Sequence, residues 1–143
     1  MQRTAIAVWD GGLRDGKGAI TTQSGALSNT PYSFATRFEK TPGTNPEELI
    51  AAAHAGCFTM ALAAQLGTMN ITPESLRTTA TVSLEKLEAG WTISKVHLDV
   101  GARIPGISAA AFESAAASAK ANCPVSRLLK AESTRTANLE QAA

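Results

Sequence analysis

Two cysteines are the residues of this sequence best suited to chemistry. Cys57 lies inside a long apolar stretch, whereas Cys123 directly precedes Pro124. A thiolate is a nucleophile, and two thiolates that can meet form a redox pair. The sequence has no CxxC motif, and two cysteines with two scattered histidines make a poor zinc site, so we expect no metal and no cofactor. The N-terminus lacks the apolar run of a signal peptide, so we expect the reducing cytoplasm, where structural disulfides are rare.

The local surroundings of the two cysteines leave their roles open. Cys57 is expected about ten residues into a helix, where the helix dipole contributes little. Burial raises the pKa of a thiol, so a reactive Cys57 needs a cation beside it, and a small buried hydrophobe is the alternative. Cys123 before Pro124 would place its sulfur at a helix N-terminus, where amide groups stabilise a thiolate. Local physics alone therefore favours Cys123 as the nucleophile.

Three other kinds of polar residue have both structural and catalytic interpretations. His54 lies one helical turn before Cys57, which would suit a Cys–His hydrolase but more often indicates a packed histidine. Glu47 and Glu48 stabilise the positive end of a helix dipole without any catalytic role. Arg37 is expected on a strand, where an arginine is usually a surface charge.

The spacing of apolar residues predicts the elements that position these groups. Strands are expected over residues 4–9, 19–22 and 32–39, with Arg37 on the face opposite the aromatic residues. A helix capped by Asn45 is predicted from Pro46 to about Gly67, apolar almost all round and therefore buried. The remaining predicted segments are a hairpin of strands 78–87 and 91–104, a helix from the Ser108 cap to about Ala121, a turn over 125–130 and a last strand over 132–139. The glycine-rich segment 11–18 lacks the Gly-Lys-Ser/Thr ending of a phosphate loop, so a hairpin loop is expected.

The order of these elements predicts the α+β class, with largely antiparallel sheets packed on a long buried central helix. No repeat or linker interrupts the chain, so residues 1–143 are expected to form a single domain.

Composition excludes several function classes and suggests an oligomer. Thirteen basic and twelve acidic residues argue against a sequence-independent nucleic-acid binder. A membrane span is not expected, because the longest apolar stretch has sixteen residues, from Leu49 to Ala64. Alanine supplies 27 of the 63 apolar residues, and only seven residues are aromatic. Such a core buries little area per side chain, so we expect a second chain to complete it.

The segment from Thr44 to Leu62, TNPEELIAAAHAGCFTMAL, resembles the signature of the OsmC/Ohr family of bacterial thiol peroxidases. Asn122 to Ser126, NCPVS, resembles the second cysteine motif of that family. Tyr32 to Glu39 is similar to the strand that carries the family arginine, and Pro105-Gly106-Ile107 fits as well. The resemblance covers essentially the whole chain.

This resemblance implies an intertwined homodimer with an active site at each subunit interface. It implies that Cys57 reduces the peroxide, that Cys123 resolves the resulting sulfenic acid as a disulfide, and that Arg37 and Glu47 are the partners of the thiolate. The expected substrates are organic hydroperoxides in defence against oxidative or osmotic stress, and an external dithiol, by resemblance a lipoyl group, would reduce the disulfide. An apolar pocket lined by Phe58, Met60 and Ile107 is our own hypothesis from apolarity.

One rival interpretation is a non-catalytic dimeric stress protein that binds a small apolar ligand. The paired cysteines and Arg37 argue against it, because apolar binding needs neither. A Cys–His hydrolase built on His54 lacks an evident third partner.

Overall fold

The computed structural model describes residues 1–140, and its backbone packing divides the chain into two compact units, 1–49 and 50–143. The sequence-based expectation of a single domain stays a prediction. The described elements are α-helices and two three-stranded sheets, so the predicted α+β class is confirmed.

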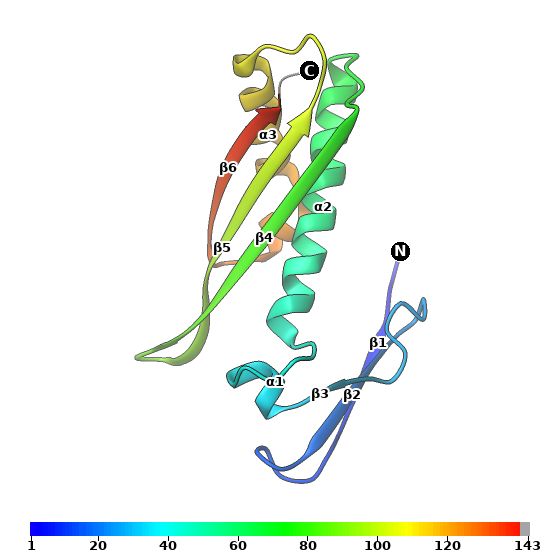
Figure 1. Ribbon diagram of the computed structural model, residues 1–143, viewed down its shortest axis with the longest axis vertical. Helices are drawn as coiled ribbons and strands as arrows, with labels where there is room; N and C mark the ends of the chain where they lie inside the picture. The colour runs from blue at the N-terminus through cyan, green and yellow to red at the C-terminus, as the bar shows by residue number, and fades with distance from the viewer. Residues whose placement is uncertain (141–143) are drawn as a thin grey trace. The chain divides into compact units, whose positions relative to one another are not determined.

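The first unit holds an antiparallel sheet in the order β1-β2-β3 (Figure 1). β1 (Ala5–Asp10) and β2 (Lys17–Thr22) lie close to the strands predicted over residues 4–9 and 19–22. The glycine-rich segment forms the hairpin between them, where the amide of Gly16 donates to the carbonyl of Gly12. A hairpin loop was predicted there and is confirmed.

The strand predicted over residues 32–39 is wrong beyond its first residue. β3 (Thr30–Tyr32) is short, and the chain then turns into the helix α1 (Phe34–Phe38). The reason is a capping box. The Ser33 side chain accepts from the Thr36 amide, and the Thr36 hydroxyl accepts from the Ser33 amide. These local bonds satisfy helix-terminal groups and outweigh the two-residue alternation of the aromatic side chains. Arg37 therefore lies in a helix.

The helix α2 (Pro46–Thr68) begins where the sequence predicts. The Asn45 side-chain oxygen accepts from the Glu48 amide at 2.8 Å, which satisfies one of the free donors of the first turn. Its side chains at every fourth position along one face are buried. These are His54, Phe58, Leu62 and Leu66.

The opposite face of α2 is exposed within the chain, although the sequence predicted burial on every side. Met60 is 77% exposed, and Ala52, Gly56, Ala63 and Gly67 are also exposed. By length and composition alone, α2 is long and apolar enough to cross a membrane. Core helices of soluble proteins meet the same criterion.

The second unit holds the sheet β4-β5-β6, and Figure 1 shows its three strands together with α2 and α3. β4 (Ser75–Leu87) and β5 (Gly90–Arg103) form the predicted antiparallel hairpin, whose turn uses Gly90 at φ +115°. β6 (Glu132–Glu140) confirms the last predicted strand and pairs parallel to β5. Alternate β5 residues Val96, Leu98 and Val100 are fully buried, as the two-residue period of a strand requires.

The two helices after the hairpin begin and end close to the positions that the sequence predicts. α3 (Ala109–Asn122) is capped by Ser108, whose side chain accepts from the Ala111 amide. Cys123 ends α3 and is also the N-cap of α4 (Pro124–Leu128), with Pro124 at the first helical position. The core of this unit joins α2, β5 and α3. Its members at 4% exposure or less are Phe58, Leu62, Leu66, Val96, Leu98, Val100, Ala102, Ile104, Phe112, Ala115, Ala116, Ala119 and Cys123.

We predict that Leu62→Ala lowers the free energy of unfolding by about 2–5 kcal/mol, because it leaves a cavity in this core. Urea denaturation followed by circular dichroism measures the loss. Leu128→Ala is the matched control, since Leu128 is 76% exposed, and its effect should stay within about 0.5 kcal/mol. Equal losses in the two variants would contradict the described packing of α2.

Candidate functional site

Arg37 and Glu47 form an ion pair within the first unit. The Arg37 Nη2 atom lies 2.7 Å from Glu47 Oε1, and Arg37 Nε donates to both carboxylate oxygens at 3.2 Å. Glu47 is only 8% exposed, whereas the Arg37 side chain is 37% exposed. The carboxylate therefore holds the guanidinium in one orientation, while part of the cation stays accessible.

The caps of two helices bring this pair together. The Asn45 side-chain nitrogen donates to the Thr36 carbonyl in α1 at 3.0 Å, while its oxygen caps α2. Asn45 thus joins the helix that carries Arg37 to the first turn of the helix that carries Glu47. The Arg37 guanidinium also stacks 5.2 Å from the Phe38 ring centre, so it does not point away from the aromatic residues as predicted.

An aromatic cavity of about 430 Å³ adjoins the Arg37 side chain within the first unit. Trp9 and Tyr32 form one part of its wall and pack edge to face, with ring centres 5.5 Å apart. Phe34, Phe38 and Arg37 form another part. The cavity therefore combines apolar surface with one cation.

Cys57 and Cys123 meet in the second unit, where their sulfur atoms lie 3.0 Å apart. Both are free thiols, because a disulfide requires about 2.05 Å. Cys57 comes from the middle of α2, and Cys123 comes from the junction of α3 and α4. Cys123 is fully buried, whereas Cys57 is partly exposed. A small movement would bring the sulfurs to bonding distance.

The acidities of the two thiols shift in opposite directions. Burial raises the pKa of Cys57, and its contact with the Cys123 thiol raises it further. Burial also opposes ionisation of Cys123, but contact with Cys57, with the Ser126 amide and hydroxyl, and with the Val125 amide lowers its pKa. The amides belong to the first turn of α4, so the predicted stabilisation of a Cys123 thiolate at a helix N-terminus agrees with this direction.

A second cavity, of about 400 Å³, opens beside Cys57. Met60, Ala61 and Ala64 of α2 give it an apolar wall, and Gln65, Asn122 and Pro124 complete its lining. Met60 was predicted to line such a pocket. Phe58 and Ile107 are not among its lining residues, because Phe58 turns into the core with no exposed surface and Ile107 packs against the same core.

His54 is a buried, hydrogen-bonded histidine. Its Nε2 atom lies 2.7 Å from the Ser126 hydroxyl, and its Nδ1 atom has no partner among residues 1–140. Burial lowers the pKa of His54, and the Lys120 charge lowers it further. The bond to Ser126 favours the structural interpretation of His54 over a Cys–His hydrolase.

Four residues were singled out from the sequence, and the structure pairs Arg37 with Glu47 and Cys57 with Cys123. Their catalytic roles stay predictions. The sequence reasoning missed Ser126, which contacts both His54 and Cys123. Its place in the motif NCPVS, three residues after the cysteine and in the first turn of a short helix, was the available signal.

We predict that the free energy of unfolding falls as the pH drops below about 6.5, because unfolded His54 binds a proton that the folded chain rejects. His54→Gln keeps a neutral side chain at every pH and should flatten this decline. Urea denaturation measures the free energy of unfolding of both proteins between about pH 5 and 8, which is the range in which histidine titrates. His97→Gln, which removes the only other histidine, is the control. An unchanged pH dependence in His54→Gln would contradict the prediction.

Comparisons with known proteins agree with the resemblance noted in the sequence. A peroxiredoxin OsmC of Escherichia coli is 53% identical over 128 residues, which cover 90% of each chain. The crystal structure of an organic hydroperoxide resistance protein OsmC from Legionella pneumophila is 27% identical, covers 96% of both chains and has a TM-score of 0.69. The organic hydroperoxide resistance protein OhrB of Bacillus subtilis is 25% identical, covers 96% of this chain and 98% of its own, and has a TM-score of 0.68.

The family profile described as OsmC-like protein matches residues 38–137, which include Glu47 and both cysteines. Arg37 lies one residue before the matched range. The chain therefore belongs to the family of OsmC-like proteins.

Proposed function

We propose that this protein is a thiol peroxidase that reduces organic hydroperoxides to alcohols and protects the cell during oxidative and osmotic stress. The observation that carries the proposal is the 3.0 Å approach of two free thiols beside an apolar cavity. The names of the relatives support it, since one is a peroxiredoxin and two are organic hydroperoxide resistance proteins. The apolar wall suits the organic part of a hydroperoxide better than hydrogen peroxide.

In the proposed reaction, the Cys57 thiolate attacks the distal oxygen of the hydroperoxide. The O–O bond breaks, Cys57 becomes a sulfenic acid, and the alkoxide takes up a proton and leaves as the alcohol. The Cys123 thiolate then attacks the Cys57 sulfur, forms the disulfide and releases the hydroxyl oxygen as water. An external dithiol, by family resemblance a lipoyl group, reduces the disulfide. The steps up to the disulfide use only the two cysteine side chains and the substrate, and we place the protein in the reducing cytoplasm.

The raised pKa of Cys57 makes a cation necessary for this assignment. We assign that role to Arg37, which Glu47 holds through a short ion pair. A guanidinium offsets the cost of a buried thiolate and also stabilises negative charge on the departing oxygen. Without that cation, the lowered pKa of Cys123 would make Cys123 the first nucleophile.

We predict that Cys57→Ser abolishes hydroperoxide consumption, because it removes the attacking sulfur. Cys123→Ser should consume about one equivalent rapidly and then stop, since the Cys57 sulfenic acid has no partner thiol. Rapid mixing with several equivalents of an organic hydroperoxide, in the presence of a dithiol that sustains turnover of the wild-type protein, measures consumption. Trapping with a sulfenic acid reagent, followed by mass spectrometry, identifies the oxidised residue.

The same experiment separates the two possible nucleophiles. A sulfenic acid on Cys123 in the Cys57→Ser variant would reverse the roles of the cysteines but keep the peroxidase function. Unchanged free thiols in the wild-type protein after one equivalent of hydroperoxide would overturn the function itself. That result would favour a non-catalytic protein that binds an apolar ligand.

We further propose that two copies of the chain form a homodimer through the exposed face of α2. This face carries small residues that let helices approach closely, with Met60 as a large apolar side chain among them. An apolar helix face of this length is costly to leave in water. The abundance of alanine agrees with close helix packing.

We predict that Ala63→Glu dissociates the dimer, because it buries a charge without a partner between the helices. Sedimentation equilibrium measures the mass of the assembly. Ala110→Glu places the same charge at an exposed site in the first turn of α3, and this control should keep the wild-type mass. A wild-type mass for Ala63→Glu, with the fold intact by circular dichroism, would exclude this face from the interface.

A further inference from the structure

A cavity with a positively charged lining lies between α3, α4 and β6, separate from the cavity beside Cys57. Its volume is about 510 Å³. Lys120 of α3, Arg127 of α4 and Arg135 of β6 contribute its charges, and no acidic residue lines it. Ser126 and Ser133 contribute hydroxyls. Such a lining favours a negatively charged ligand over an apolar one.

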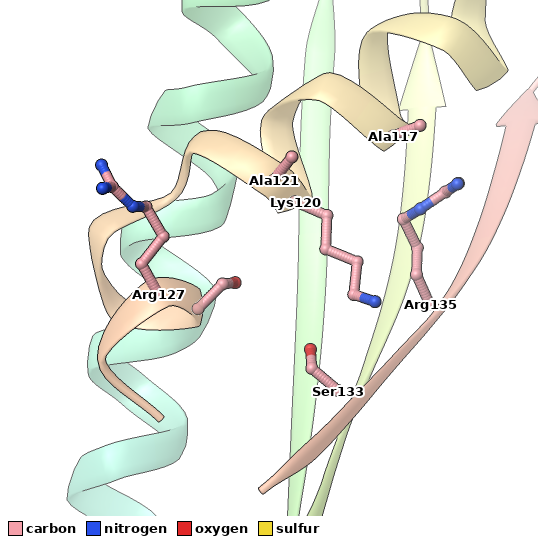
Figure 2. Close-up of a pocket in the computed structure, with 7 residues that line it drawn as sticks. Ala117, Lys120, Ala121, Arg127, Ser133 and Arg135 are labelled. Carbon is pink, nitrogen blue, oxygen red and sulfur yellow. The ribbon is translucent and has the colours of Figure 1, made fainter. Parts of the chain in front are cut away.

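Figure 2 shows how these side chains are placed. Lys120 extends from α3 in the direction of the strand that carries Ser133 and Arg135, whereas the Arg135 guanidinium is directed away from the Lys120 amine. Arg127 lies on the opposite flank, with its guanidinium directed away from Lys120. Lys120 and β6 therefore form the centre of the positive lining, and Arg127 forms its rim.

The hydrogen-bonding capacity of this lining is incompletely used. Among the described side chains, buried polar atoms without a partner are His54 Nδ1, Ser133 Oγ and Arg135 Nε. Ser133 and Arg135 line the cavity, but these two atoms are themselves buried, so they are not donors for a ligand that occupies it. The Ser126 hydroxyl, which also belongs to a lining residue, bonds to His54. The charges of the lining, rather than unpaired donors, therefore favour an anion.

The charges of the lining are also only partly balanced. Glu113 binds the terminal nitrogens of Arg135 at 2.5 and 3.0 Å and thereby orients the guanidinium. The buried Nε–H group of Arg135 has no partner among the described residues. Lys120 and Arg127 form no ion pair among residues 1–140. An anion that accepts a hydrogen bond from Lys120 would offset this unpaired positive charge.

We propose that this cavity binds a small organic molecule through an oxyanion group, a phosphate or a carboxylate, seated against Lys120 within the positively charged lining. Both groups offer several acceptor oxygens to a cationic donor. The volume lies within the roughly 300–1,000 Å³ range of small-molecule sites and exceeds what the oxyanion alone needs. The exposed Ala117 and Ala121 supply an apolar wall for the rest of the molecule.

Ser126 connects this site to the thiol pair without making them one site. It lines the anion cavity, bonds to His54 and contacts the Cys123 sulfur. The cavity beside Cys57 shares none of its lining residues with the anion cavity. Oxyanion binding is therefore measurable in the resting protein, with no hydroperoxide present.

The test uses the intact protein and two probes, inorganic phosphate and acetate. Isothermal titration calorimetry measures the affinity of each probe, and the amide NMR signals of residues 120, 127 and 133–135 locate it. The probe that binds with the higher affinity identifies the oxyanion class. Lys120→Gln should weaken binding of the more tightly bound probe by roughly tenfold, because a charged hydrogen bond is lost.

Lys86→Gln is the matched control, because it removes the same charge at an exposed position in the β4–β5 hairpin and should leave the affinity unchanged. Circular dichroism confirms that each variant is folded. The proposal is overturned if neither probe binds saturably below about 10 mM. It is also overturned if Lys120→Gln and Lys86→Gln bind the probe with equal affinity. Binding only to the dissociated Ala63→Glu variant would overturn it as well, because a second copy of the chain would then occupy the cavity in the dimer.

Discussion

The packing of α2 against β5 and α3 determines whether the two cysteines can react with each other. Phe58, Leu62 and Leu66 anchor one face of α2 in the core, and Cys57 lies next to Phe58 on the same helix. Cys123 joins the same core from the end of α3 and is fully buried. Because side chains in a close-packed core have little freedom, the 3.0 Å approach of the sulfurs follows from the helix packing.

This packing also creates an electrostatic problem. Burial disfavours thiolate formation at Cys57, while the first-turn amides of α4 favour it at Cys123. A resolving cysteine benefits from being readily ionised, since it must attack as a thiolate. A peroxidatic cysteine at position 57 needs a positive charge in addition, and the oriented Arg37 guanidinium is the group to which we assign that charge. The proposed chemistry thus depends on a cation that the helix itself does not supply.

Polar residues around α4 extend this arrangement beyond the cysteines. Ser126 satisfies one nitrogen of the buried His54 and also contacts Cys123. Ser126 also lines the positive cavity, together with Lys120 and Arg127. A single short helix therefore separates an apolar redox centre from a polar site of different chemistry. This division explains why the basic residues near α4 need not take part in peroxide reduction.

The sequence by itself determined the α+β class, most element positions and the identity of the two cysteines. Helix starts were predictable because caps such as Asn45 and Ser108 act through neighbouring backbone groups. The β4–β5 hairpin was predictable because alternation and Gly90 are local signals. Segment 32–39 was the exception, since the Ser33–Thr36 capping box favoured a helix over the alternating aromatic pattern.

Only the tertiary structure decided which side chains meet. The pairs Cys57–Cys123 and His54–Ser126 join residues 66 and 72 positions apart, and the cavity between α3, α4 and β6 exists only when those elements pack. Tertiary structure also decided that one face of α2 stays exposed within the chain. Local sequence patterns indicate which side chains are buried, but not which neighbour packs against them, because the hydrophobic effect has no direction.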